Sequence, residues 1–154
     1  MNLATILPAD CVLVRLDARD KKQALKLLSA YASEKVGLSE REIYGVLKER
    51  EQMGCTGMGN GVCIPHGRFE KLSGLHAIFA TLDYPIDFGA ADNKPVDLLF
   101  LLLTPASSNT EHLKALAVVS RLLRDKGLCE QVRSMKDPQA IHALLLSAGR
   151  AEEA

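Results

Sequence analysis

The stretch "VDLLFLLL" (96–103) decides the fold. Its nearly continuous apolar character is typical of a central strand that is buried on both faces. A sheet that is covered on both faces needs helices on either side of it. We therefore expect an α/β fold: a single three-layer domain over residues 1–150, with a mixed β-sheet flanked by helices on both sides. A frayed tail should follow at 151–154.

Three further strands are expected outside this stretch. Apolar and β-branched residues predict strands at "CVLVRL" (11–16) and "LHAIFATLD" (75–83), and a short strand at "VCI" (62–64) that stops at Pro65. Residues 54–61 are rich in glycine and predict a loop. No internal repeat or linker divides the chain, so all of these strands are expected to belong to one sheet.

Helices alternate with the strands. Apolar residues at helical spacing predict a helix over about 20–35, which Asp17 or Asp20 can cap. Ser39 and Glu42 form a capping box for a second helix, which runs to about residue 52. In the last third we expect a long helix capped by Ser108 or Asn109 and followed by Gly127, a helical turn at 128–134, and a final helix from Asp137–Pro138 to about 147.

Composition excludes several classes of protein. The chain has 154 residues, with 19 Lys+Arg against 19 Asp+Glu, and so lacks the basic surplus of a nucleic-acid binder. No apolar run approaches the ~20 residues of a bilayer span, and the amino terminus does not resemble a signal peptide. We expect no nucleic acid and no stable membrane insertion. The four cysteines show no framework spacing, which indicates reduced thiols in a cytoplasmic protein.

A histidine in "GNGVCIPHGR" (59–68) is the first candidate for chemistry. Pro65 fixes its own φ and keeps Ile64 extended, while Gly67 allows a sharp turn and leaves space beside the His66 ring. A histidine that only completes a structural turn fits the same pattern. The segment alone therefore leaves both interpretations open.

Two other polar residues interrupt apolar stripes. Arg50 continues the apolar line of its helix at the carboxyl end, where it can reach the solvent along its stem or point inward at an anion. His112 lies in the first turn of the long helix, on a face that is otherwise apolar. With His66, these residues make a plausible anion-handling pocket, although the sequence does not show that they converge.

Four chemistries compete for these residues. "GMGNG" follows a helix and precedes a strand, the reverse of a nucleotide loop, so we exclude nucleotide binding. Cys55, Cys63 and His66 lack a fourth zinc ligand, and a Cys63 nucleophile lacks an orienting partner. The fourth chemistry, phosphoryl acceptance, suits a histidine that is neutral at pH 7, with Arg50, His112 and loop amides as charge-stabilising donors.

The segment "TGMGNGVCIPHGR" (56–68) resembles the active-site segment of the IIA domains of the bacterial phosphoenolpyruvate-dependent phosphotransferase system. The fructose/mannitol type is the most similar, and within it the nitrogen-regulatory members. "PIDFGAADNKPVDLLFLLLTPA" (85–106) and "HLKALAVVSRLL" (112–123) also match, so the resemblance covers nearly the whole chain. Cys55 departs from the expected small residue, such as serine.

The resemblance implies a phosphohistidine carrier. His66 would accept the phosphoryl group on Nε2 from an HPr-like phosphocarrier protein, and Arg50 and His112 would support the group without a metal or a cofactor. The carrier would regulate targets such as potassium transporters or sensor kinases. The alternative in the same chemistry is a sugar-specific IIA component that passes the group to a IIB cysteine. A binding module with a structural His66 and a metal-dependent hydrolase are alternatives of other classes.

Overall fold

A six-stranded mixed sheet forms the centre of the computed structural model, which describes residues 2–107 and 109–153. The strand order is β1-β5-β6-β3-β2, and β4 pairs with the remaining length of β6. β5 and β6 are antiparallel, whereas β1 runs parallel to β5, and β3 and β4 run parallel to β6. The strands are β1 (Val12–Leu16), β2 (Gly57–Gly59), β3 (Val62–Cys63), β4 (His66–Phe69), β5 (His76–Ile86) and β6 (Val96–Pro105).

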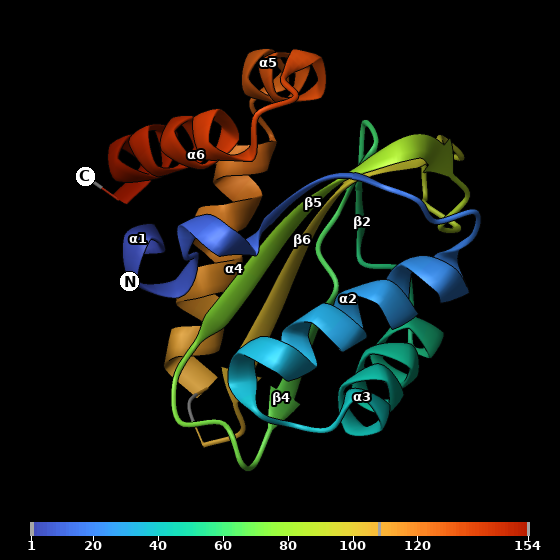
Figure 1. Ribbon diagram of the computed structural model, residues 1–154, viewed down its shortest axis with the longest axis vertical. Coiled ribbons are helices and arrows are strands. Elements are labelled where there is room, and N and C mark those ends of the chain that lie inside the picture. Colours follow the sequence, from blue (N-terminus) through green and yellow to red (C-terminus); the bar gives the residue numbers. More distant parts are fainter. Residues whose placement is uncertain (1, 108, 154) are drawn as a thin grey trace.

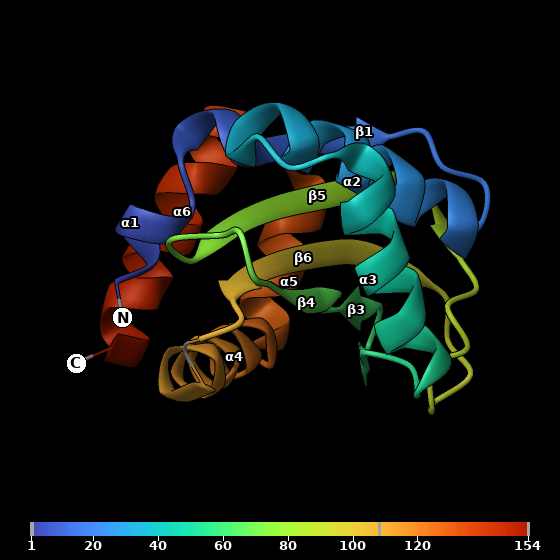
Figure 2. The same cartoon turned by 90° about the horizontal axis from the view of Figure 1, so that it is seen from below.

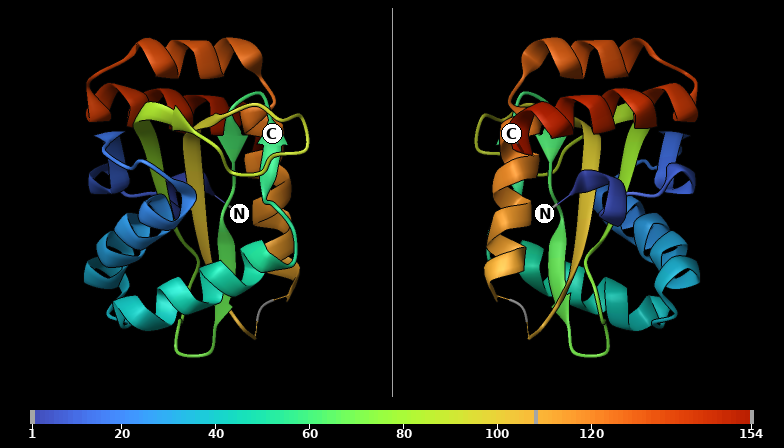
Figure 3. Two further views of the ribbon diagram at one scale, coloured as in Figure 1. Left: turned by 90° about the vertical axis from the view of Figure 1, so that its right-hand side faces the viewer. Right: turned by 90° about the vertical axis from the view of Figure 1, so that its left-hand side faces the viewer.

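Helices cover both faces of the sheet, as predicted. Both views of Figure 3 place α2 and α4 on opposite sides of β5 and β6. In Figures 1 and 2, α3 lies beside α2, while α6 lies with α4 on the other face. The helices are α1 (Leu3–Ile6), α2 (Lys21–Val36), α3 (Glu40–Gln52), α4 (Asn109–Leu123), α5 (Lys126–Ser134) and α6 (Pro138–Glu153), with a 3₁₀ turn η1 (Ala9–Cys11) before β1.

The central position of β6 is confirmed. Its residues 98–103 are all buried, as the continuous apolar run predicted. Phe79 of β5 lies opposite Phe100 of β6, with 6.0 Å between the ring centroids. Removing this much apolar surface from water is the main contribution to the stability of the fold. None of the helices in the described part of the chain has the length and apolar character of a bilayer span.

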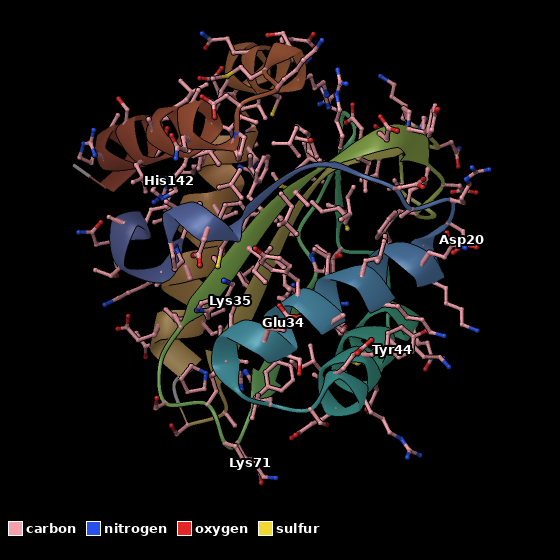
Figure 4. All side chains as sticks on the ribbon, viewed as in Figure 1. Asp20, Glu34, Lys35, Tyr44, Lys71 and His142 are labelled. Atoms are coloured by element: carbon pink, nitrogen blue, oxygen red, sulfur yellow. The ribbon has the colours of Figure 1, made fainter. Side chains whose placement is uncertain are left out.

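Two helix starts are confirmed atom by atom. Asp20 accepts a hydrogen bond from the amide of Gln23 at the start of α2, at the position labelled in Figure 4. Ser39 accepts one from the amide of Glu42 at the start of α3. These bonds satisfy amide groups that would otherwise lack a partner within the helix.

The predictions for the last third of the chain were less accurate. Gly127 does not follow a helix end, because Asp125 caps α5 and places Gly127 in its first turn. The final helix continues beyond the expected end near 147 to Glu153. The predicted cap at Ser108 lies outside the described residues, as does the side chain of Asn109. The sequence interpretation also missed α1 and the short strand β2 inside the glycine-rich loop.

A break at Pro65 places the candidate histidine. β3 and β4 follow one another along the same edge of β6, with Val62 opposite Leu98 and His66 opposite Leu102. Pro65 has no amide hydrogen to donate, so the ladder is interrupted there, although its carbonyl still accepts from Leu102 at 2.9 Å. The chain then resumes as a strand rather than making the sharp turn that was predicted at Gly67.

Candidate functional site

The His66 ring is held in one tautomer by two contacts. Its Nδ1 lies 2.8 Å from the carbonyl oxygen of Ile64, which can only accept, so Nδ1 carries the hydrogen and donates it. Its Nε2 is therefore the unprotonated nitrogen. The Nε–H of Arg50 donates to this nitrogen at 3.3 Å. The ring thus presents its lone pair at Nε2, next to a guanidinium group.

The surroundings of His66 favour its neutral form. Partial burial is the largest effect and lowers the pKa of His66, and the positive charge of Arg50 lowers it further. The hydrogen bond to Ile64 and the charge of Glu51 act in the opposite direction, and the net pKa lies below the ordinary value of 6.5. At neutral pH the lone pair on Nε2 is consequently free of a proton.

Gly67 brings α3 close enough for Arg50 to reach the histidine. A Cβ at Gly67 would lie only 2.6 Å from Cγ1 of Val46, so helix and strand could not approach this closely with any other residue there. Val46 and Arg50 are four residues apart and lie on the same face of α3. Arg50 also donates from Nη1 to the carbonyl of Gly54 at 3.0 Å, which orients its guanidinium.

His112 lies beside His66, as the proposed pocket requires. The two ring centroids are 5.3 Å apart. The hydroxyl of Thr104 donates to the carbonyl of Gly67 at 3.2 Å, so it accepts from Nδ1–H of His112 at 2.9 Å. His112 is 7% exposed, as its place on the apolar face of the helix indicates. Burial is also the main cause that lowers its pKa, followed by the charges of His66 and Arg68.

The three predicted residues line one open hollow together with groups that the sequence interpretation missed. The hollow measures about 400 Å³, and Arg68, Met53 and Glu49 also line it. Arg68 stands two residues after His66 on β4 and is exposed. Arg68 was missed because β4 was not predicted: residues two apart on a strand face the same way, so a strand here would have placed Arg68 beside His66. Thr104, which orients His112, gave no signal because it ends an apolar run.

Two exposed apolar side chains belong to the segments that border the hollow, and one of them, Met53, lines it. Met53 follows the end of α3 and is 79% exposed, while Leu113 follows His112 on α4 and is 65% exposed. Large apolar side chains this accessible, next to a polar pocket, are typical of a surface that another protein covers.

The alternatives based on metal or cysteine chemistry find little support in the geometry. Within the described ranges, Cys55, Cys63 and His66 do not form a group of three that could hold a metal ion. Cys63 is fully buried, and burial raises the pKa of its thiol well above the ordinary value of 9.0. "GMGNG" (57–61) forms β2 and the turn from β2 to β3, in place of a phosphate-binding loop that opens a helix.

Comparisons with known proteins find one matching family and several relatives. Residues 5–148 match the family model "Phosphoenolpyruvate-dependent sugar phosphotransferase system, EIIA 2". The chain is 45% identical over 145 residues to a "Nitrogen regulatory protein" of Bradyrhizobium diazoefficiens, covering 94% of this chain and 95% of the relative. It is 37% identical over 147 residues to a "Nitrogen regulatory protein" of Escherichia coli, covering 94% and 90%.

A solved structure shows the same fold. The crystal structure of nitrogen regulatory protein IIA-Ntr from Neisseria meningitidis superposes with a TM-score of 0.88 at 30% identity, covering 92% of this chain and 97% of that one. The mixed sheet and its helical layers are therefore those of a IIA protein, as the sequence predicted.

Proposed function

The chain belongs to the EIIA type 2 family of the phosphoenolpyruvate-dependent sugar phosphotransferase system, and from this premise we propose that His66 accepts a phosphoryl group on Nε2 from the phosphohistidine of an HPr-like carrier. The observation that carries the proposal is the tautomer of His66. Ile64 holds the hydrogen on Nδ1, which leaves the lone pair of Nε2 facing the hollow and the guanidinium of Arg50.

The transfer exchanges one phosphorus–nitrogen bond for another. The lone pair of His66 Nε2 attacks phosphorus in line with the donor nitrogen, and that bond breaks as the donor imidazole leaves with its electron pair. No proton has to leave His66 during the attack, because its hydrogen is on Nδ1 and remains bonded to Ile64. The hydrogen bond to Ile64 stabilises the positive charge that develops on the ring.

Arg50 has the geometry to receive the negative charge of the transferred group. Its Nε–H occupies the place beside Nε2 in the free protein, at a long 3.3 Å. When phosphorus bonds to Nε2, that hydrogen bond must be exchanged for one to an equatorial oxygen. The planar fork of a guanidinium makes this exchange with little movement, because its remaining N–H groups lie in the same plane.

His112 supplies a second donor that depends on protonation. With Nδ1–H held by Thr104, the neutral ring presents a lone pair at Nε2. A phosphoryl dianion beside it favours protonation of that nitrogen, since an opposite charge stabilises the imidazolium form. We expect His112 to take up a proton as His66 is phosphorylated and then to donate to the bound group.

The carrier acts on regulatory partners through its state of phosphorylation. The dianion adds about −1.5 to −2 charges at neutral pH beside the exposed Met53 and Leu113. A partner that covers this surface therefore meets a hollow whose lining of Arg50, Arg68 and Glu49 is net positive in the free protein and becomes more negative on phosphorylation. The relatives named nitrogen regulatory proteins support a regulatory role over sugar transport. The HPr-like donor and the regulated targets are the partners implied.

Phosphorylation tests the proposal directly. The chain is incubated with phosphoenolpyruvate, enzyme I and an HPr-like donor, and acid-labile phosphate is measured by mass and by ³¹P NMR. We expect one phosphoryl group, lost in His66→Gln and retained in His142→Gln, a matched histidine that contacts Leu7 far from the hollow. Equal labelling of His66→Gln would refute the assignment. Rapid transfer onward to a IIB cysteine would support the sugar-specific alternative.

A further inference from the structure

Two thiols lie in the segment that runs from the end of α3 into β3. Cys55 is half-buried and Cys63 is fully buried in β3. The Cys55 sulfur accepts the amide hydrogen of Gly57 at 3.1 Å. The pairing of β2 with β3 places Gly57 opposite Cys63, so it brings the two cysteines to the same part of the sheet edge.

We propose that Cys55 and Cys63 form a site of reversible oxidation by hydroperoxides, in which Cys55 attacks the peroxide and Cys63 then closes a disulfide. The position of each sulfur assigns its role. Cys55 is the more accessible member and accepts the amide hydrogen of Gly57, whereas Cys63 is fully buried and contacts the hydroxyl of Thr56. Attack therefore starts at Cys55.

The charges around the pair support these roles. The neighbouring Cys63 thiol lowers the pKa of Cys55 to about 6, although burial opposes it, and Gly57 and Lys21 lower it further. Glu51 raises it, and the carbonyl of Phe88 accepts from the protonated thiol at 3.2 Å. At neutral pH Cys55 is thus largely a thiolate, the reactive form.

The other cysteines are protected from the same reaction. Burial raises the pKa of Cys11 to about 11, and it raises the pKa of Cys129 above its ordinary value. Both are buried. Cys129 is consequently a suitable control for the chemistry at Cys55.

The reaction balances in two steps. The Cys55 thiolate attacks the terminal oxygen of the hydroperoxide, the O–O bond breaks, and an alkoxide or hydroxide leaves; sulfur loses two electrons and becomes a sulfenic acid. Cys63 sulfur then attacks Cys55 sulfur, the S–O bond breaks, and the Cys63 hydrogen leaves with the hydroxyl as water. A thiol reductant reverses the disulfide by exchange.

Oxidation reaches the histidine through Thr56. The Thr56 hydroxyl lies 2.8 Å from the Cys63 sulfur and donates to Glu51, the neighbour of Arg50. Its carbonyl accepts the amide hydrogen of Ile64 at 3.1 Å, and Ile64 in turn holds Nδ1 of His66. Drawing Cys63 into a disulfide removes its contact with Thr56. The segment that orients His66 therefore shifts when the thiols are oxidised.

Peptide mapping after peroxide treatment tests the site on the full chain. Reduced protein is treated with hydrogen peroxide at pH 7 and digested without reductant. We expect a Cys55–Cys63 disulfide that dithiothreitol removes, formed in Cys129→Ala as in the wild type. In Cys63→Ala, dimedone should trap a sulfenic acid on Cys55, which should oxidise at least about tenfold faster than Cys129 in the wild type. Cys55→Ser should form neither product.

Several outcomes would overturn the proposal. They are an unmodified Cys55 under these conditions, a disulfide that involves Cys11 or Cys129 instead, or oxidation of Cys55 no faster than of Cys129. Should Cys63→Ala fail to fold, time-resolved dimedone trapping in the wild type still decides whether Cys55 reacts first. These measurements do not depend on phosphoryl transfer, so they can fail or succeed independently of the proposed function.

The effect on the histidine has its own measurement. ¹⁵N NMR of the imidazole should show a changed Nδ1 signal for His66 in the oxidised protein and an unchanged one in oxidised Cys55→Ser. An identical His66 spectrum in both redox states would refute the coupling through Thr56. A slower phosphoryl transfer in the oxidised protein is the further expectation, and it rests on the proposed function.

Discussion

Two arginines at different ends of the sheet differ in how fully their charge is paired. Arg133 of α5 donates to both carboxylate oxygens of Asp97, at 3.1 and 2.9 Å, to Glu130 at 3.1 Å and to the carbonyl of Asn60 at 2.7 Å. Arg50 donates to a neutral imidazole and to one carbonyl, and meets no carboxylate at ion-pair distance within residues 2–107 and 109–153.

The difference separates a structural arginine from one that is available to a ligand. Arg133 joins α5, the start of β6 and the turn at Asn60, and its donors are used within the fold. Arg50 is held in place but keeps an uncompensated charge beside an open hollow. The hydrogen-bond donors are already oriented toward an anion that enters the hollow, so they need little rearrangement to bind it. A substitution of Arg50 should therefore slow phosphoryl transfer with little change in stability. A substitution of Arg133 should lower the stability with little change in transfer.

Arg50→Gln should have the largest effect on transfer. Removing one positioned donor for a developing negative charge costs roughly 10²- to 10³-fold in rate, and we expect that loss in phosphoryl acceptance by His66. The free energy of unfolding should change little, because no buried carboxylate is left without its partner. Quenched-flow labelling with the phosphorylated donor measures the rate, and urea denaturation measures the stability. A severe loss of stability with an unchanged rate would equate Arg50 with Arg133.

Gly67→Ala should damage both properties at the same site. The added Cβ would lie 2.6 Å from Cγ1 of Val46, so α3 must move away and carry Arg50 with it. Overpacking of this kind costs about 1–3 kcal/mol of stability. Displacing Arg50 should slow transfer by about tenfold, since small misplacements of a positioned group are costly.

A second substitution makes this prediction specific. Val46→Ala removes the atom that the new Cβ would meet, and the double variant should regain most of the lost rate. A double variant as slow as Gly67→Ala alone would show that the close approach of helix and strand does not position Arg50.

Arg133→Gln should show the opposite pattern to Arg50→Gln. It leaves the Asp97 carboxylate, a partly buried group, without its main partner, and we expect a loss of about 1–3 kcal/mol in the free energy of unfolding. Phosphoryl acceptance by the folded variant should stay within about twofold of the wild type, because Arg133 does not line the hollow with His66. A large loss of rate in fully folded protein would contradict the comparison.

Local rules predicted what local interactions decide. Hydrophobic periodicity and helix capping depend on neighbours in the chain, so the sequence could predict them. They include the apolar run of β6, the caps at Asp20 and Ser39, and the interruption of apolar stripes by Arg50 and His112. β4 was missed because its four residues pair with the far end of β6 and have little strand character of their own. The sharp turn predicted at Gly67 was wrong for a similar reason. Only the packing of α3 against β4 shows which atoms a Cβ at Gly67 would contact.

The smallest expected effect is the pH dependence of stability that arises from the pKa of His66, which Arg50 helps to lower. Burial and the Arg50 charge lower the pKa of His66 below 6.5 in the folded protein, so the unfolded chain binds more protons just below that pH. The corresponding stability is fully present above about pH 6.5 and is lost as pH falls toward the pKa of the folded state. His112 and His76, whose pKa values burial also lowers, contribute in the same direction.

NMR titration of the imidazole C–H signals measures this prediction. Phosphoryl acceptance should fall as His66 becomes protonated, because protonation removes the lone pair from Nε2, and it should change by less than about twofold between pH 7 and 8. Arg50→Gln should raise the pKa of His66, since a positive charge that opposed protonation is lost. Arg133→Gln should leave it unchanged. A His66 pKa above 6.5, or equal shifts in the two variants, would mean that the unpaired charge of Arg50 does not act on the histidine.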